Sequence, residues 1–204
     1  FRPRFIDRAI ISAENGGIKP LIVLNKIDQN ISSDVRNRLK WYENLGYDVL
    51  KVSAKSGKNI EKLRTILKGK TTAFVGQSGV GKSTLLNTLN PELSLRVGEI
   101  SEKFNRGKHT TCYAIMVPLA EYSIIDTPGI RELNLFGVDP SVLSHFFPEF
   151  YKYWGECKFK GCTHTHEPGC AIKNAIENGD IDEDRFVGYN SIIQELEDSR
   201  SKFY

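Results

Sequence analysis

A glycine-rich segment in the first half of the chain has the composition of a phosphate-binding loop. Its candidate nucleotide-binding residues are Gly76, Gln77, Ser78, Gly79, Val80, Gly81, Lys82, Ser83 and Thr84. The glycines let the backbone curl so that its N–H groups face phosphate oxygens, while Lys82 meets the β- and γ-phosphates and Ser83 binds Mg²⁺. A strand over 71–75 must enter this loop and a helix over 82–89 must leave it, and the apolar pattern predicts both.

Two further motifs have the composition of a guanine-binding site. Asn25-Lys26-Ile27-Asp28 ends a continuous apolar run, and Ser53-Ala54-Lys55 follows one strand–helix unit later. Asp28 would accept hydrogen bonds from the guanine N1–H and exocyclic amine, while Asn25 and the stem of Lys26 frame the ring. Adenine has no matching pair of donors, and a mispaired carboxylate costs about 1–3 kcal/mol. The motifs therefore predict GTP.

Asp126-Thr127-Pro128-Gly129 has the pattern of the motif that senses the γ-phosphate. Asp126 is expected to be an outer-sphere or Walker-B-type partner of Mg²⁺. The Gly129 N–H is expected to contact the γ-phosphate. Ras-like enzymes continue with a glutamine that orients the attacking water. Here the next residue is Ile130, whose aliphatic side chain cannot orient water, so hydrolysis should be slow or depend on another group.

His109 is the candidate for that group. It lies in Gly107-Lys108-His109-Thr110-Thr111, at the position of the first switch loop. A histidine in a loop is more often simply exposed to solvent. The motif alone therefore leaves both a catalytic role and a surface role open for His109. Thr111 is the expected Mg²⁺ ligand, with Thr110 as the alternative.

Three of the four cysteines lie close together near the C-terminus, in the pattern Cys157-x4-Cys162-x-His164-x5-Cys170. Disulfides would leave one of the three unpaired, whereas Cys₃His is a donor set for a closed, structural zinc site. His166 is an alternative to His164, and unligated buried cysteines are the plainer interpretation. His145 is expected to be an ordinary helix-surface residue.

Strand and helix patterns alternate through the first part of the chain, which predicts an α/β fold with a mostly parallel sheet and flanking helices. The opening helix has its expected apolar face at Ile6, Ala9, Ile10 and Ala13. A hairpin is expected over 113–119 and 122–126. Short helices follow from about 139, and a final helix has its apolar face at Phe186, Tyr189, Ile193 and Leu196. We predict a GTPase domain over 1–140 and a small helical zinc-binding domain over 141–204.

The motifs occur in an unusual order. In a Ras-like domain the phosphate-binding loop and DxxG come first and NKxD comes last, whereas here NKxD comes first. The pattern predicts a circular permutation, which a compact domain tolerates when its ordinary termini lie close together. Because residue 1 lies almost at the helix before NKxD, we expect the GTPase domain to be N-terminally incomplete.

The bulk composition allows a globular protein and excludes little. The chain has 204 residues, 40% of them hydrophobic, and a formal net charge of +3. No apolar run reaches the roughly 18 residues that a membrane helix requires, and the start lacks the apolar core of a signal peptide. A cytoplasmic location is expected.

Together, the permuted order, GKHTT, DTPGI and the cysteine cluster resemble the RsgA (YjeQ/YloQ) family of small-subunit ribosome biogenesis GTPases, over essentially all of the chain. The resemblance implies a bacterial GTPase of late small-subunit maturation, stimulated by the subunit, with the histidine at position 109 implicated in hydrolysis. It also implies Mg²⁺ with GTP or GDP, one structural Zn²⁺, contact with rRNA and a monomer. The family's N-terminal OB-fold domain is not in this sequence.

Two other functions are alternatives to a GTPase of small-subunit maturation. One is a zinc-containing rRNA-binding module in which the nucleotide only stabilises the fold. The other is a P-loop kinase for a small molecule, which conflicts with the guanine-reading motif at Asn25–Asp28.

Overall fold

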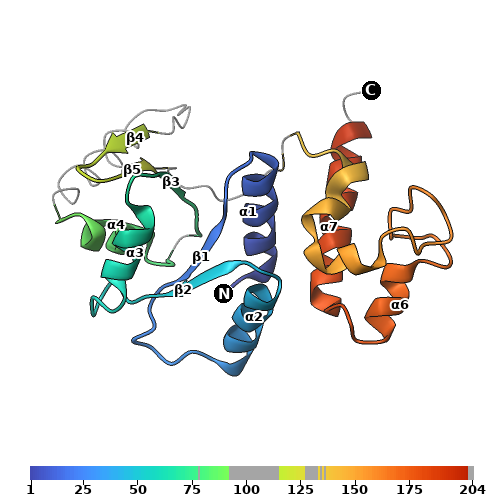
Figure 1. Cartoon of the computed structure of the whole chain (residues 1–204), viewed down its shortest axis with the longest axis horizontal. Coiled ribbons are helices and arrows are strands. Elements are labelled where there is room, and N and C mark those ends of the chain that lie inside the picture. The colour runs from blue at the N-terminus through green and yellow to red at the C-terminus, as the bar shows by residue number, and fades with distance from the viewer. Residues whose placement is uncertain (78, 92–114, 127–132, 134, 136, 202–204) are drawn as a thin grey trace. The chain divides into compact units, whose positions relative to one another are not determined.

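In the computed structural model, the chain forms two compact units (Figure 1). Unit 1 comprises Phe1–Pro20, Asn44–Gly46 and Leu133–Tyr204, and unit 2 comprises Leu21–Glu43 and Tyr47–Glu132. The structure describes residues 1–77, 79–91, 115–126, 133, 135 and 137–201. In these ranges, every helix is too short or too polar to cross a membrane.

Unit 2 contains two small sheets, both with parallel pairing. Strand β1 (Leu21–Leu24) pairs in parallel with β2 (Asp48–Lys51), and α2 (Ser33–Asn44) connects them. In the other sheet the strand order is β3-β5-β4. Here β3 (Thr71–Phe74) pairs in parallel with β5 (Ser123–Asp126), and β4 (Ile115–Pro118) pairs with β5 as an antiparallel hairpin. The predicted strands and hairpin are confirmed within the described residues.

Two helices supply most of the core of unit 2. In α3 (Ile60–Leu67), the apolar residues Ile60, Leu63 and Leu67 are all buried. In α4 (Lys82–Leu89), Leu85, Leu86 and Leu89 are buried in the same cluster, with Val52 and Ile124. Apolar residues spaced three and four apart lie on one face of a helix, which is why the sequence pattern predicted these elements.

The ends of the parallel strands deliver the motifs to the loops that follow them. Leu24 is opposite Lys51 in the register of β1 and β2, so the NKxD and SAK motifs both follow the same edge. Phe74 is likewise opposite Asp126, so the phosphate-binding loop and DxxG follow one edge of the second sheet. Ligands of parallel α/β sheets bind at such carboxyl edges.

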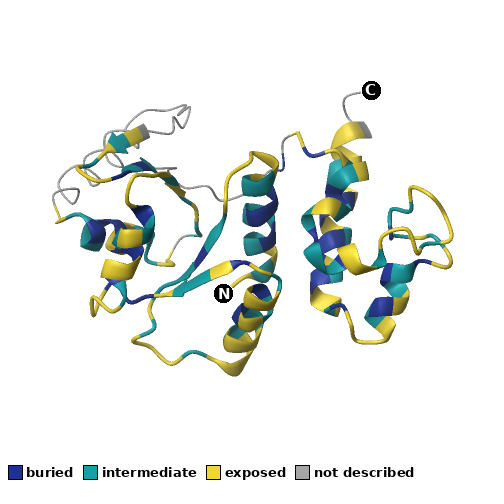
Figure 2. Ribbon diagram, viewed as in Figure 1, coloured by how far each residue is buried: buried dark blue, intermediate teal, exposed yellow. Residues whose placement is uncertain are grey.

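Unit 1 is helical and combines both ends of the chain. It contains α1 (Pro3–Asn15), the 3₁₀ helices η2 (Pro140–Phe146) and η3 (Pro148–Tyr153), α6 (Ala171–Glu177) and α7 (Glu183–Ser201). Figure 2 shows buried positions along both α1 and α7. Phe147, Phe150 and Tyr189 form the aromatic centre of the core, with ring centroids 5.1–5.2 Å apart.

The buried face of α1 differs from the prediction. Of the four expected apolar residues only Ile10 is buried, and Asp7 and Ile11 are the other buried residues of the helix. Ile11 belongs to the core of unit 1. An apolar pattern cannot reveal this rotation, because it does not count a charged residue such as Asp7 among the buried positions.

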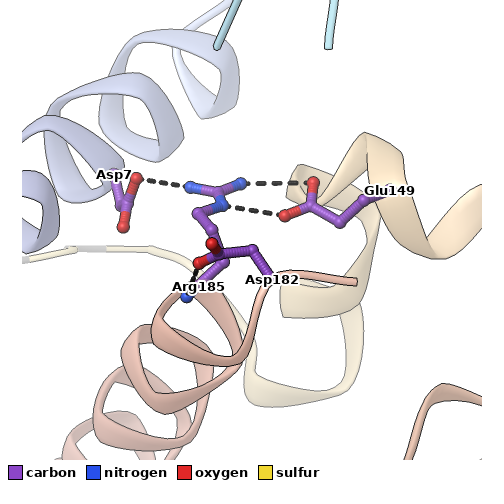
Figure 3. A network of polar contacts seen from close by, with 4 residues as sticks. All are labelled: Asp7, Glu149, Asp182 and Arg185. Atoms are coloured by element: carbon purple, nitrogen blue, oxygen red, sulfur yellow. Dashed lines mark hydrogen bonds and ion pairs between the residues drawn. The ribbon is translucent and has the colours of Figure 1, made fainter. Parts of the chain in front are cut away.

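A buried arginine explains the burial of Asp7 (Figure 3). Arg185, at the start of α7, is 2% exposed and hydrogen-bonds to Asp7 of α1. Its Nε and Nη2 atoms donate to the two carboxylate oxygens of Glu149 in η3, at 2.8 and 3.3 Å. The guanidinium also lies 4.5 Å from the centroid of the Phe147 ring. One cation therefore joins three separate elements of unit 1.

We predict that Arg185→Met destabilises unit 1 by about 3–5 kcal/mol, because it leaves two buried carboxylates without their cation. The exposed pair Arg200–Asp139, with a nitrogen–oxygen distance of 3.7 Å, supplies the control. Arg200→Met should change stability by no more than about 1 kcal/mol. Urea unfolding followed by the fluorescence of Trp154, in a Trp41→Phe background, measures both. Equal effects of the two substitutions would contradict the prediction.

Candidate functional site

The side chain of Asn25 connects the two base-reading motifs with the phosphate-binding loop. Its Oδ1 accepts a hydrogen bond from the Ala54 N–H at 3.0 Å. Its Nδ2 donates to the backbone oxygens of Val80 at 3.2 Å and of Gly81 at 3.4 Å. The structure thus brings together three motifs that are separated by up to 56 residues in the sequence.

Lys26 also reaches the phosphate-binding loop. Its Nζ donates to the backbone oxygen of Gly79 at 2.7 Å. The residue has a φ of 69°, in the left-handed region that costs a non-glycine residue energy. That conformation is held in a turn whose backbone bonds run from Ile27 N to Val52 O at 3.2 Å and from Gln29 N to Lys26 O at 3.0 Å. Its extended side chain is therefore available to lie along a bound base.

Asp28 is held by Ser53. The Ser53 hydroxyl donates to Asp28 Oδ1 at 2.6 Å, and its oxygen accepts from the Ser56 N–H at 3.1 Å. The hydrogen bond from Ser53 is the largest cause that lowers the pKa of Asp28, and the charges of Lys55 and Lys26 act in the same direction. The carboxylate is consequently charged at neutral pH, which is the form that accepts hydrogen bonds from guanine.

Gly81 is required by the close contact between the loop and Asn25. It caps the N-terminus of α4 with a φ of 88°. A Cβ atom at this position would lie 2.5 Å from Asn25 Nδ2, so either the loop or the Asn25 side chain would have to move and the hydrogen bonds between them would be disturbed. Gly79 also has a positive φ, of 84°, but open space around it. The sequence predicted glycines here for phosphate binding, and Gly81 is needed for packing as well.

The structure describes some of the other predicted nucleotide-binding residues and not others. Lys82, Ser83 and Thr84 form the first turn of α4, and Gln77 lies in the loop before it. For Asp126 only the backbone, at the end of β5, is described. The following lie outside the described residues: Ser78, His109, Thr110, Thr111, Cys112, Gly129 and Ile130.

The structure gathers the four predicted zinc ligands in unit 1. The ligand atoms of Cys157, Cys162, His164 and Cys170 all lie within 4.8 Å of one another. His164 Nδ1 lies 3.3 Å from the Cys170 sulfur, and the sulfurs of Cys157 and Cys170 are 4.0 Å apart. Sulfurs bound tetrahedrally to zinc at about 2.3 Å lie about 3.8 Å apart, so the spacing fits that ion.

Protonation at this cluster has a direct consequence for metal binding. Burial lowers the pKa of His164 and so favours the neutral imidazole, which is the ligand form. Burial also raises the pKa of the Cys162 thiol to about 12. A cation that binds here must therefore displace thiol protons.

Glu167 organises the loop that carries His164, and sequence reasoning did not single it out. One carboxylate oxygen accepts from the Thr163 N–H and hydroxyl at 2.6 and 2.7 Å, and the other accepts from the Thr165 N–H at 3.1 Å. Although burial opposes it, the two hydrogen bonds from Thr163 are the main causes that lower the pKa of Glu167 to about 2. The threonines flanking the histidine were the available signal. His166 instead contacts the Thr165 hydroxyl, with Nδ1 at 3.0 Å from it.

A phosphate-binding loop joined to a guanine-reading motif, with the reader first in the chain, defines a P-loop nucleotide-binding protein of permuted motif order. The RsgA GTPase profile matches residues 1–136. The chain belongs to the RsgA GTPase family, as the motifs predicted.

Named relatives and solved structures agree with that membership. The protein "Small ribosomal subunit biogenesis GTPase RsgA" of Borrelia garinii subsp. bavariensis is 43% identical over 197 residues, which are 97% of this chain and 64% of that protein. The Haemophilus influenzae protein of the same name is 42% identical over 97% of this chain and 58% of its own length. The chain thus spans about three-fifths of the length of these relatives.

Two crystal structures share the fold. YjeQ from Thermotoga maritima superimposes with a TM-score of 0.74 at 34% identity, covering 96% of this chain and 66% of that one. YloQ, described as a circularly permuted GTPase, gives a TM-score of 0.73 at 30% identity and covers 98% of this chain and 64% of its own. The predicted permuted α/β fold is confirmed.

We predict that Gly81→Ala weakens GDP binding at least about tenfold, because the new methyl group must displace either the loop or the Asn25 side chain and so disturb the contact between them. Gly69 is the matched control, since its φ is 72° but a Cβ there would meet nothing within 4 Å. Both variants should lose about 1–2 kcal/mol of stability from the left-handed backbone. Fluorescent GDP titration and thermal unfolding separate the two effects. Unchanged GDP affinity in Gly81→Ala would contradict the role of this contact.

Proposed function

We propose that this protein is a GTP hydrolase that acts as a checkpoint in late maturation of the small ribosomal subunit, and that the subunit stimulates its turnover. The observation that carries the proposal is the Asn25 side chain, which joins the base-reading motifs to the phosphate-binding loop. The names of the relatives support the choice of ribosomal partner. The GTP form would dock on the immature subunit, and hydrolysis would release it.

The roles of the nucleotide-site residues follow from their positions. Asp28 reads guanine N1–H and the exocyclic amine, and Ser53 orients its carboxylate. Gly81 brings no capping side chain to α4, so the first N–H groups of this helix are suited to phosphate. Lys82 neutralises the β- and γ-phosphates, and Ser83 is proposed as a ligand of Mg²⁺. Mg²⁺ held there would help to neutralise the charge that develops on the phosphates.

His109 is proposed as the group that positions or deprotonates the attacking water. The support is its place in GKHTT and the aliphatic Ile130 after DTPG. Thr111 is proposed as the second Mg²⁺ ligand, with Thr110 as the alternative, and the Gly129 N–H as the contact to the γ-phosphate. Asp126, at the end of β5, is proposed as an outer-sphere or Walker-B-type partner of Mg²⁺.

Zinc at Cys157, Cys162, His164 and Cys170 is proposed to be structural. The donor set and the spacing of its atoms support this ion. These four residues would supply all four ligands of a zinc ion, so a bound zinc would hold the loop in shape and leave no open coordination position for chemistry.

We propose that the protein acts in the cytoplasm, in keeping with a role on the ribosome, and that it acts as a monomer.

GTP turnover with small subunits, with large subunits and without either tests the proposal. A sharp rise with small subunits alone is expected. The competing function, a zinc-containing rRNA-binding module in which nucleotide is mainly structural, requires unchanged turnover and subunit binding that does not depend on nucleotide.

We predict that Asp28→Asn shifts preference from GTP toward xanthosine triphosphate, because an amide can donate to the xanthine carbonyl where the carboxylate accepted from guanine. Dissociation constants for both nucleotides measure the change. Since Asp34 is an exposed acidic residue of the same unit, Asp34→Asn serves as the control. If Asp28→Asn still prefers GTP, the base is read elsewhere.

We predict that His109→Ala preserves GTP affinity and lowers subunit-stimulated turnover by about 10²–10⁴-fold, the usual contribution of a proton-transfer or water-positioning group. Ile130→Ala should have a milder effect. Single-turnover hydrolysis with saturating small subunits measures both variants. Full stimulated activity of His109→Ala would remove this histidine from the mechanism.

We predict that Cys162→Ser abolishes stimulation by the subunit while GTP affinity stays nearly unchanged. The cluster lies in unit 1, and the base-reading contacts and the phosphate-binding loop lie in unit 2. Bound zinc per chain, GTP affinity and stimulated turnover are measured together, with Cys112→Ser as the control outside the cluster. Equal loss of nucleotide binding and stimulation would contradict separate roles for the two units.

A further inference from the structure

Three aromatic side chains of unit 1 lie in contact outside both candidate sites. Tyr151 and Trp154 are 47% and 50% exposed, and their ring centroids are 4.5 Å apart. The His145 ring lies 4.9 Å from that of Trp154. We call these three residues the aromatic platform. Large aromatic side chains gathered in the open usually mark an interaction surface.

The short 3₁₀ helices account for the platform. In such helices residues three apart lie above one another. Phe147 and Phe150 follow this spacing into the core, and both are 0% exposed. Tyr151 of η3 and Trp154, the residue that caps its C-terminal end, have the same spacing of three and are both exposed. The Tyr151 hydroxyl donates to the His145 backbone oxygen at 2.6 Å, so the ring is held before any ligand arrives.

The segment of chain that carries Tyr151 and Trp154 is rich in lysine. Lys152, Lys158 and Lys160 are exposed, and Glu156 is the one exposed acidic residue between 151 and 160. Glu149 is buried against Arg185 and its charge is balanced there. Lysines are depleted in protein–protein interfaces, whereas surfaces that bind single-stranded nucleic acid combine aromatic rings with positive charge.

Acidic groups limit where phosphate can lie. The pKa of the Tyr151 hydroxyl is raised, first by burial and then by the negative charges of Glu14 and Glu149. The same two negative charges would repel a phosphate placed beside Tyr151. Phosphate is therefore expected at the lysines, while the rings of the platform take the uncharged base.

We propose that the aromatic platform, with Lys152, Lys158 and Lys160, binds single-stranded RNA and stacks an unpaired base on Tyr151 and Trp154. The choice of RNA over DNA rests on the proposed function. The stacking surface itself does not depend on GTP or on its hydrolysis.

Trp154 can report on its own ligand. The chain has two tryptophans, and Trp41 lies in α2 of unit 2. In a Trp41→Phe background, an unstructured RNA of about a dozen nucleotides should quench the fluorescence of Trp154. A duplex RNA of the same length should quench it far less, because its bases are already stacked. No quenching by the single strand would overturn the proposal.

Substitution separates stacking from charge. Trp154→Ala and Tyr151→Ala should each weaken binding of the labelled RNA about 5- to 100-fold, and Trp154→Phe should recover most of the loss because it keeps a ring. Replacing Lys152, Lys158 and Lys160 with glutamine should reduce the slope of log Kd against log salt by about 2. Glutamine at three exposed lysines of unit 2 (Lys40, Lys58, Lys62) is the matched control.

Zinc content and thermal midpoint confirm that each variant is folded. Wild-type RNA affinity in both alanine variants would overturn the proposal. So would a Trp154 signal that responds to intact small subunits but not to protein-free small-subunit rRNA, because the partner would then be a protein. The assay contains no GTP, so a failure of the proposed hydrolysis cannot change its result.

Discussion

The nucleotide unit depends on one amide side chain. Asn25 uses its oxygen and its nitrogen at the same time, toward Ala54 on one side and the loop at Val80 and Gly81 on the other. The two sheets of unit 2 each place their motifs at a strand edge, but neither sheet positions the other's motif. An amide is suited to this task because it both donates and accepts. Neither aspartate nor leucine at this position could make both kinds of contact.

This arrangement is compatible with a permuted chain because it is made by contacts that do not depend on chain order. Asn25 lies 56 residues before Gly81, and the hydrogen bond between them would be the same in the reverse order. What permutation changes is which elements begin and end the chain. Helices α1 and α7, which lie before and after unit 2 in the sequence, pack together in unit 1.

The sequence predicted local structure and motifs well because both depend on nearby residues. Leu63 and Leu67 reveal α3 by their spacing, and Lys26 and Asp28 reveal the base reader by their type. The burial of Asp7 could not be predicted, because its partner Arg185 is 178 residues away and both residue types usually face solvent. The role of Glu167 escaped for the same reason, since a carboxylate in a loop is most often solvated. The predicted domain boundary at 140 stays a prediction, although α1 belongs to the same compact unit as the C-terminal helices.

The discontinuity of unit 1 has a consequence for synthesis of the protein. All of unit 2 lies between the two long segments of unit 1, and only Asn44–Gly46, which belong to unit 1, interrupt it. Its segments are translated consecutively, so it can fold while the rest of the chain is still being made. Helix α1 leaves the ribosome before unit 2 and α7, yet Asp7 must wait for Arg185 before its charge is balanced. Helix α1 therefore emerges before unit 2 but reaches its final packing after it, and until then its buried face is open to chaperones and proteases.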